Sequence, residues 1–208
     1  MAVTAESAFP PLAQRSVMRK LRDEAEAARV RIVRRVFTES LNRVWRDLFV
    51  RLAPEEPFVP QFRVPDVSRG VAATLETMHR DGKPGGPPAA MLSAGNLNTA
   101  ALTLFLALNL AVEQRLPWIL LDDPVQSMDE VHVAQFAALL RTLAREHERR
   151  IVIAVHERAL FEYLTLELSP ANPDDSLIIV ELTRTQDGST LVQPSFQTYV
   201  EDRALEAV

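Results

Sequence analysis

Two adjacent carboxylates, Asp122 and Asp123, follow directly after the apolar run Trp118 to Leu121. Such a run predicts a buried strand of a parallel sheet. Burying two carboxylates is costly unless a cation compensates them, and at the carboxyl end of a strand in an α/β sheet the usual cation is Mg²⁺ with a nucleotide. The pattern therefore predicts that Asp122 holds Mg²⁺ and that Asp123 orients or deprotonates an attacking water. The alternative is a strand that ends in a polar turn, because Asp-Asp-Pro is also good turn chemistry.

A second candidate site is Leu92-Ser93-Ala94-Gly95-Asn96, which stands directly before an apolar helical pattern from Leu97 to Val112. Ser93 is a good helix cap, and Gly95 allows a ligand to approach the backbone closely. The N–H groups at the start of a helix suit a phosphate, so the segment predicts an anion-binding turn. An ordinary capped helix without a ligand is the alternative, because this short pattern is weak by itself.

A third candidate is His156, which follows the apolar run Ile151 to Val155 together with Glu157. The run predicts a second buried strand. A histidine at a strand end is often only a satisfied polar residue. Here, however, it is expected at the same sheet edge as Asp122 and Asp123, and the three elements together are more specific than any one of them.

The order and spacing of these elements resemble the C-terminal half of an ABC-type ATPase head, in particular the heads of the SMC, SbcC and RecN group of DNA-associated ATPases. The resemblance covers roughly residues 30 to 200. Leu92 to Asn96 looks like the ABC signature and Ile119 to Pro124 looks like the Walker B strand. Ser127-Met128-Asp129 looks like the D-loop, and His156 looks like the switch histidine. The implied fold class is α/β, a P-loop NTPase-type C-terminal lobe.

The resemblance implies a mechanism in which two heads sandwich two ATP molecules. Ser93, Asn96 and the N–H groups near Gly95 would face the γ-phosphate bound by the opposite head. Asp129 would lie at the dimer interface and couple the two sites. No role follows for Gln126 from the resemblance, although its place in the loop after the carboxylates allows contact with an edge of the nucleotide.

The same resemblance assigns the chemistry to residues at the strand ends. Asp122 would help to hold Mg²⁺, Asp123 would activate the hydrolytic water, and His156 would stabilise charge on the γ-phosphate. Hydrolysis would separate the heads and transmit the change to DNA or to a partner nuclease, a step that rests on family analogy.

Three departures from the family pattern limit this reading. The family usually has Gly where Ala94 stands and Glu where Asp123 stands, so the base reaches less far and turnover could be slow. No Gly-x-x-x-x-Gly-Lys-Ser/Thr segment, the Walker A loop, occurs in the sequence. The glycine-rich stretch Asp81 to Pro88 is instead predicted to be a flexible loop. The chain is therefore expected to be inactive alone and to need a Walker A-containing N-terminal lobe, as a fragment or a subunit of a split ATPase.

An arginine-rich helix is predicted before Pro54. Residues 15 to 51 hold 11 Lys or Arg and 5 Asp or Glu, so this segment carries +6 and the rest of the chain −11, which together give the net charge of −5. One face is apolar: Val17, Leu21, Ala25, Ala28, Ile32, Val36, Leu41, Val44, Leu48 and Leu52. We interpret this helix as the base of a coiled-coil arm whose arginines lie near DNA phosphates; the alternative is a solvated helix whose arginines pair with acidic neighbours. Trp45 and Phe49 are expected in the core.

The predicted organisation is a helical arm at residues 1–53 and a C-terminal lobe at residues 54–208. Within the lobe the patterns predict strands, helices and a closing hairpin around Asp187-Gly188. The strands are expected at 58–64, 71–78, 118–122, 151–155, 177–183 and 191–199, and the helices at 97–112, 129–148 and 157–168.

Composition excludes several classes of protein. There is no cysteine, so a disulfide framework and a thiolate metal site are excluded, and a cytoplasmic location is expected, with nucleoid association left open. Met1 to Pro11 has no basic segment of the kind that begins a secretory signal. The apolar stretch Ala100 to Val112 is only 13 residues long, so a core helix is predicted there, and no membrane partner is expected.

Two functions remain open at this point. The favoured one is an ATP-hydrolysing half-head that acts on DNA in repair, recombination or chromosome maintenance, with a second head as partner. The alternative is a non-catalytic dimerisation or regulatory module derived from such a head. A transport ABC subunit is less favoured because of the arginine-rich arm.

Overall fold

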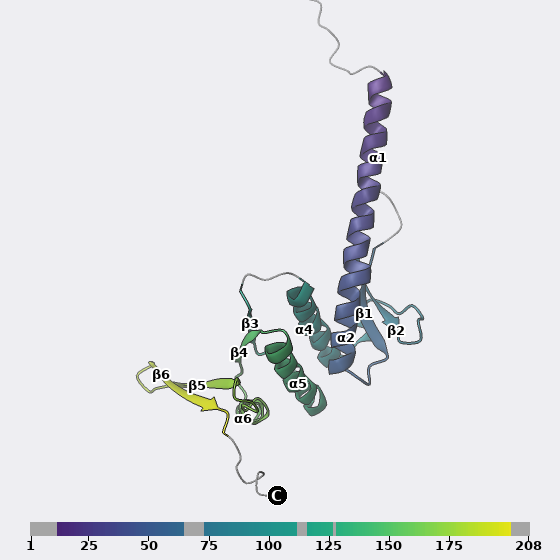
Figure 1. Cartoon of the computed structure of the whole chain (residues 1–208). Coiled ribbons are helices and arrows are strands. Elements are labelled where there is room, and N and C mark those ends of the chain that lie inside the picture. Colours follow the sequence, from purple (N-terminus) through teal and green to yellow (C-terminus); the bar gives the residue numbers. More distant parts are fainter. Residues whose placement is uncertain (1–11, 65–72, 112–115, 127, 201–208) are drawn as a thin grey trace, which may run out of the picture. The chain divides into compact units, whose positions relative to one another are not determined.

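The computed structural model describes residues 12–64, 73–111, 116–126 and 128–200 of the chain (Figure 1). The chain folds as two compact units, Met1–Glu113 and Gln114–Val208. The first unit contains a long helical arm, a small antiparallel sheet and one apolar helix. The second contains a parallel strand pair, two helices and a hairpin. The α/β class predicted from the sequence is confirmed.

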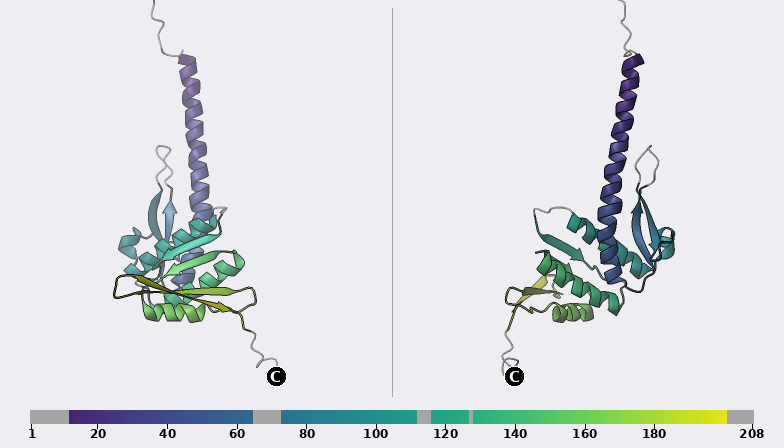
Figure 2. Two further views of the ribbon diagram at one scale, coloured as in Figure 1. Left: turned by 90° about the vertical axis from the view of Figure 1, so that its left-hand side faces the viewer. Right: turned by 45° about the vertical axis from the view of Figure 1, so that its right-hand side comes forward.

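The arm consists of α1 (Leu12–Arg34), η1 (Arg35–Leu41) and α2 (Asn42–Leu52), which follow one another as a single rod (Figure 2). It ends before Pro54, as predicted, because proline cannot continue the helix. The middle segment, η1, is π-helical, which the sequence pattern did not predict. Thr38 lies in this segment, and its hydroxyl donates a hydrogen bond to the carbonyl of Arg34.

The apolar stripe of the arm is buried along α2 and exposed along α1. Trp45 and Phe49 are 1% and 0% exposed, which confirms their predicted place in the core. Here α2 packs on α4 (Ala94–Ala111) and on β1 (Phe58–Arg63). In α1 the apolar side chains stay in contact with solvent: Val17, Met18, Leu21 and Ile32 are all more than half exposed. The apolar face of α1 therefore has the pattern of a helix that pairs with a second helix, but no described residue covers it.

The sheet of the first unit pairs β1 with β2 (Thr74–His79) in antiparallel register, with Gln61 opposite Glu76. Both strands were predicted, although β2 begins later than expected. Residues 65–72, between the described parts of the two strands, lie outside the described residues.

The segment predicted to be a flexible loop is instead bound to β2. Thr77 is buried, and its N–H and its hydroxyl both donate to the carbonyl of Gly86, each at 2.9 Å. The N–H of Gly85 donates to the carbonyl of Thr77 at 2.9 Å, and Pro84 forms a β-bridge with Met78. The prediction of mobility was wrong because glycine lets the backbone approach the strand closely, and β2 offers its edge for pairing. The short helix α3 (Pro88–Met91) then leads into the next turn.

Helix α4 is the apolar helix of the first unit. It begins earlier than the predicted Leu97 and has 18 residues; it is the one helix in the described parts of the chain that is long and apolar enough to cross a membrane. A core helix passes the same test, and α4 buries Thr99, Thr103 and Leu106. The indole N–H of Trp45 donates to the carbonyl of Ala100 at 3.0 Å, so one face of α4 packs against the arm, whereas Phe105 and Leu108 are 43% and 46% exposed.

In the second unit, β3 (Trp118–Asp122) and β4 (Arg150–Ala154) form a parallel pair in which Asp122 lies opposite Ala154. The crossover helix α5 (Glu130–Glu146) packs on β4 and on α6 (Arg158–Glu167). This βαβ arrangement confirms the predicted strands and helices.

Burial of the parallel pair differs from the prediction of fully buried strands. Ile119 and Leu121 are 1% and 8% exposed, but Leu120 is 69% exposed and Val152 is 44% exposed. Successive side chains of a strand point to opposite faces, so one face of this pair is covered and the other is open. Parallel sheets are normally covered on both faces.

The closing hairpin pairs β5 (Ser176–Arg184) with β6 (Thr190–Thr198) around Asp187-Gly188, as predicted. Gly188 has φ of 85°, a conformation that the turn requires and that glycine adopts without strain. Asp187 accepts hydrogen bonds from Thr185 and Ser189 in the same turn. The register is therefore fixed at the turn, and each strand presents alternate residues to its two faces.

Candidate functional site

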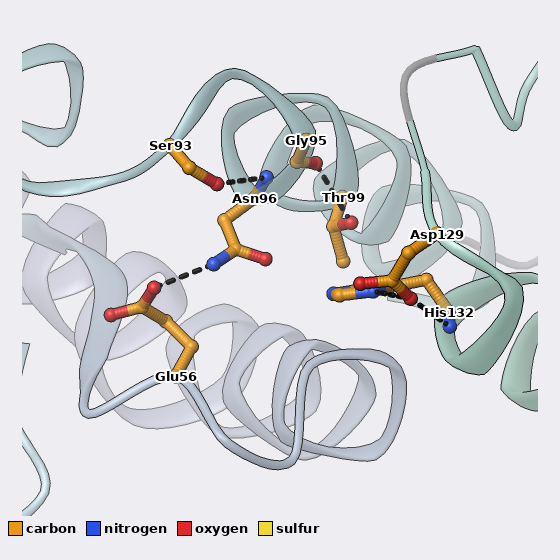
Figure 3. Close-up of polar contacts among 7 residues, drawn as sticks. All are labelled: Glu56, Ser93, Gly95, Asn96, Thr99, Asp129 and His132. Atoms are coloured by element: carbon orange, nitrogen blue, oxygen red, sulfur yellow. Dashed lines mark hydrogen bonds and ion pairs between the residues drawn. The ribbon is translucent and has the colours of Figure 1, made fainter.

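The turn before α4 has the geometry of a capped helix start. The Oγ of Ser93 accepts a hydrogen bond from the N–H of Asn96 at 3.2 Å (Figure 3). The carbonyl of Ser93 accepts one from the N–H of Leu97 at 2.8 Å. Ser93 is exposed, and Gly95 is half-buried. The hydroxyl of Thr99 donates back to the carbonyl of Gly95 at 3.0 Å. The predicted cap is thus present; Ser93 and Ala94 are exposed, and the next three residues of α4 are half-buried.

Asn96 makes a second contact that the sequence pattern did not reveal. Its Nδ2 donates to Oε2 of Glu56 at 2.6 Å, and Glu56 lies between α2 and β1 (Figure 3). The other carboxylate oxygen of Glu56 accepts the N–H of Phe58 at 3.0 Å. No local signal marks this pair, because 40 positions separate Glu56 from Asn96 in the sequence.

The two predicted catalytic residues lie together in the second unit. Nδ1 of His156 is 2.9 Å from Oδ2 of Asp123. The N–H of Asp123 donates to the carbonyl of Ala154 at 2.8 Å, which extends the β3–β4 pairing by one residue. Asp123 has φ of 48°, in the left-handed region where Asp and Asn are better tolerated than most residues. The turned backbone carries the Asp123 side chain towards His156, two positions beyond the end of β4.

The carboxylates are more open to solvent than the sequence predicted. Asp122 is exposed, the side chain of Asp123 is 26% exposed, and that of His156 is 75% exposed. The prediction of two buried carboxylates was wrong: Asp122, at the end of β3, is exposed, and Asp123 is only half-buried before the chain packs inwards again at Val125. Among the described residues, His156 is the partner that contacts the Asp123 carboxylate in an ion-pair geometry.

The segment from Pro124 to Asp129 connects the carboxylates to α5. Val125 is buried and accepts a hydrogen bond from the N–H of Met128 at 3.1 Å, whereas Gln126 is exposed. Ser127, part of the predicted D-loop, lies outside the described residues. Buried Val125 anchors this segment while leaving the side chain of Gln126 accessible.

Asp129 is the N-cap of α5. Its Oδ1 accepts the N–H of His132 at 3.0 Å and lies 2.7 Å from Nδ1 of the same histidine (Figure 3). These bonds, the backbone bond first, lower the pKa of Asp129 below its ordinary value of 3.8. His132 was missed by the sequence reasoning, although Asp followed by His three positions later at a helix start is a readable signal.

The acidic groups suit Mg²⁺ only in combination with a nucleotide. Among the residues that the structure describes, no group of three or more His, Asp or Glu side chains could hold a metal ion by itself. Mg²⁺ is usually bound by one or two carboxylates together with phosphates and waters. Asp122, exposed at the carboxyl end of β3, fits the part of one such ligand.

Comparisons with known proteins identify the fold. No protein-family model matches the chain, and no curated protein gives a significant match. Three solved structures illustrate the likeness. One is described as "Structural biochemistry of ATP-driven dimerization and DNA stimulated activation of SMC ATPases"; it has a TM-score of 0.55 and 19% identity, over 80% of this chain and 89% of that one.

The other two are an SMC head bound to the C-terminal winged-helix domain of ScpA and a Pyrococcus furiosus SMC head with an extended coiled coil bound to the C-terminal domain of ScpA. The first has a TM-score of 0.56 and 16% identity over 82% of this chain, and the second has 0.59 and 18% over 88%. The chain spans only 45% and 41% of these two proteins. The likeness shows that the chain has the fold of part of an SMC head, an α/β lobe with a helical arm.

Proposed function

We propose that this chain is the ATP-binding and ATP-hydrolysing half of an SMC-like head that acts on DNA, completed by a polypeptide that carries a phosphate-binding loop. The observation that carries the proposal is the contact between Asp123 and His156, 2.9 Å apart. In a chain with the fold of an SMC head, this contact joins a carboxylate that can activate water to an imidazole that can face a phosphate.

In the proposed reaction each residue of the strand ends has a separate task. Asp122 holds Mg²⁺, which supplies neutralisation of the charge on the phosphates. Asp123 orients the attacking water and accepts its proton. His156, fixed through Nδ1, can present Nε2 to the γ-phosphate and stabilise the charge that develops there. Gln126, exposed in the segment after the carboxylates, can contact the edge of the nucleotide.

The turn before α4 acts on a nucleotide bound by the opposite head. Ser93 and Ala94, at the start of α4, are exposed, so the turn is open to a phosphate supplied from outside the chain. A second head is therefore the expected partner, and Asp129 would lie at the interface that the two heads form. ATP-driven dimerisation is named for the SMC ATPases of one similar structure.

The need for a completing lobe is supported by two open apolar faces. The first face lies on the parallel pair of β3 and β4, where Leu120 and Val152 are exposed. Both faces of a parallel sheet are normally covered by other elements. On the hairpin, directly opposed residues share a face, and one face is apolar over its three central pairs, with polar pairs at both ends. Its pairs are Ile178 with Phe196, Val180 with Pro194, and Leu182 with Val192. We assign both faces to contact with the lobe that supplies the phosphate loop.

We propose that the arm pairs with a second helix and contacts DNA. Met18, Leu21, Ala25, Ala28 and Ile32 follow each other at spacings of three and four, which is the pattern of a coiled-coil seam. The excess of arginine over acidic residues in this segment favours contact with phosphates of DNA. DNA-stimulated activation is named for the SMC ATPases of the same similar structure. A nuclease partner and a cytoplasmic location remain predictions from the sequence.

A non-catalytic dimerisation or regulatory module is the second candidate. It is favoured by the short side chain of Asp123, which already contacts His156 and reaches less far than a glutamate would. Both candidates predict nucleotide-dependent association, and only the first predicts turnover.

Measurement of Mg-ATP binding and turnover separates the candidates. The chain would be assayed alone and together with a polypeptide that carries a phosphate loop. Turnover only in the mixture supports the split head. Association with ATP but without turnover supports the regulatory module. Absence of both binding and turnover in the mixture would contradict the proposal.

A further inference from the structure

We propose that Glu56 is a positioning residue that fixes the nucleotide-facing turn before α4 through Asn96. This inference rests on the proposed function, because it assigns Glu56 to the turn that would meet the γ-phosphate. Glu56 itself is not assigned any contact with nucleotide.

The contacts of Glu56 bridge two elements of the first unit. One carboxylate oxygen accepts the N–H of Phe58 at the start of β1, at 3.0 Å, and the other accepts Nδ2 of Asn96 in the first turn of α4, at 2.6 Å. Glu56 and Asn96 are both half-buried. A hydrogen bond to a carboxylate is stronger and shorter than one between neutral groups, so this bond restrains the Asn96 side chain (Figure 3).

The loop that carries Glu56 is itself held in place. Its first residue, Ala53, donates its N–H to the carbonyl of Phe49 at 2.8 Å, and its carbonyl accepts Nη2 of Arg80 at 3.0 Å. At the other end, the carbonyl of Pro57 accepts the N–H of Arg80 at 2.9 Å. Two prolines in the loop, at positions 54 and 57, restrict the backbone further. Glu56 therefore stands on a rigid support between the arm and β1.

The restraint extends from Asn96 to Ser93. The N–H of Asn96 donates to Oγ of Ser93 at 3.2 Å. A serine hydroxyl that accepts this bond keeps its own hydrogen for donation to another group. Ser93 is exposed, so that hydrogen can be offered to an anion outside the turn. Glu56 thus acts through Asn96 on the direction in which Ser93 donates.

Three substitutions test this positioning role. Glu56→Ala removes both contacts, Glu56→Gln keeps an acceptor for Asn96, and Asn96→Ala removes the same contact from the other side. Glu55→Ala is the matched control, because Glu55 is an exposed carboxylate in the same loop. ATP-dependent association would be measured for the full chain mixed with the phosphate-loop polypeptide, and thermal unfolding would be measured in parallel.

We expect Glu56→Ala and Asn96→Ala to weaken the ATP-dependent association by about tenfold, as suits the loss of one charge-assisted hydrogen bond. Glu56→Gln is expected to recover most of the affinity, and Glu55→Ala to leave it unchanged. Wild-type association by Glu56→Ala would overturn the inference. Equal losses in Glu56→Ala and Glu55→Ala would also overturn it.

A readout on the chain alone separates this inference from the proposed function. Amide NMR spectra of the full chain report the environment of residues 93–96 without any nucleotide or partner. In Glu56→Ala we expect the amide signals of this turn and the side-chain signals of Asn96 to shift, with partial recovery in Glu56→Gln. Unmoved signals would refute the role of Glu56 even if the wild-type head hydrolyses ATP. Shifted signals in a chain that never associates with ATP would refute the proposed function instead.

Discussion

Nδ1 of His156 and Oδ2 of Asp123 are 2.9 Å apart, although Asp123 follows β3 and His156 follows β4. The parallel register brings them together, because Asp122 pairs with Ala154 and the chain continues past both strands at the same edge. A histidine whose Nδ1 contacts a carboxylate has its ring orientation fixed, and its Nε2 then points to a different group. The pair is therefore a carboxylate beside an oriented imidazole, which is the arrangement that the proposed roles of Asp123 and His156 require.

Asp123→Asn in the completed head should abolish ATP turnover while ATP-dependent dimerisation persists or strengthens. Asparagine tolerates the φ of 48° at this position, so the fold should be kept. It cannot accept a proton from water, and the loss expected for a general base is at least a hundredfold. Single-turnover hydrolysis and light scattering on the same sample measure both effects. Unchanged turnover would remove Asp123 from the role of base.

Asp129→Ala should destabilise the second unit by about 1 kcal/mol, which is typical for the loss of an N-cap. Asp129 accepts the N–H of His132 at 3.0 Å, and alanine leaves this N–H to water. Asp129→Ser is the matched variant, because serine can cap the helix and should recover most of the stability. Urea unfolding of the three proteins measures the difference. Equal stabilities would show that the cap contributes nothing.

Gly85→Ala should destabilise the first unit by about 1–3 kcal/mol, the usual range for overpacking a closed site. A Cβ at this position would lie 2.2 Å from Oγ1 and 2.8 Å from the carbonyl oxygen of Thr77. Combination with Thr77→Ala should restore only part of the stability, because the backbone carbonyl remains in the way. Gly86→Ala is a milder control, since its Cβ would meet the flexible side chain of Met91 at 3.3 Å. Thermal unfolding distinguishes these variants.

The order of the strands and helices could be predicted from the sequence, because apolar runs and turn residues act locally. The positions of Asp123 and His156 followed from the same logic, since the ends of parallel strands share an edge. Burial could not be predicted: Leu120 looks like a core residue in the sequence, and its exposure depends on which faces are covered in space. The partner of Asn96 was equally hidden, because Glu56 reaches it only through the tertiary fold.

The turn of the hairpin predicts a specific acid dependence. Hydrogen bonds from Thr185 and then from Ser189 lower the pKa of Asp187 from 3.8 to about 2. A lowered carboxyl pKa means that the stabilisation is complete above pH 3.8 and is lost as the pH falls towards 2. NMR titration of the Asp187 carboxyl should show a midpoint near pH 2, and Thr185→Val should move it upwards. A midpoint near 3.8 in the wild type would contradict the hydrogen-bonded turn.

Leu182→Gln should weaken completion of the head while leaving the fold of this chain intact. Leu182 is 68% exposed on the apolar face of the hairpin, opposite Val192, so its replacement removes little buried area from the chain itself. In the completed head, however, a glutamine would leave its amide buried against an apolar lobe, which costs about 1–3 kcal/mol and weakens the association by about ten- to a hundredfold.

The matched control for this face is Thr183→Gln, an exposed position that points to the opposite face of the same strand. Titration calorimetry with the phosphate-loop polypeptide compares the two variants, and circular dichroism checks that both are folded. Loss of binding in Leu182→Gln alone locates the completing lobe on the apolar face. Equal binding by the two variants would mean that the lobe does not cover this face and that the hairpin is open for another partner.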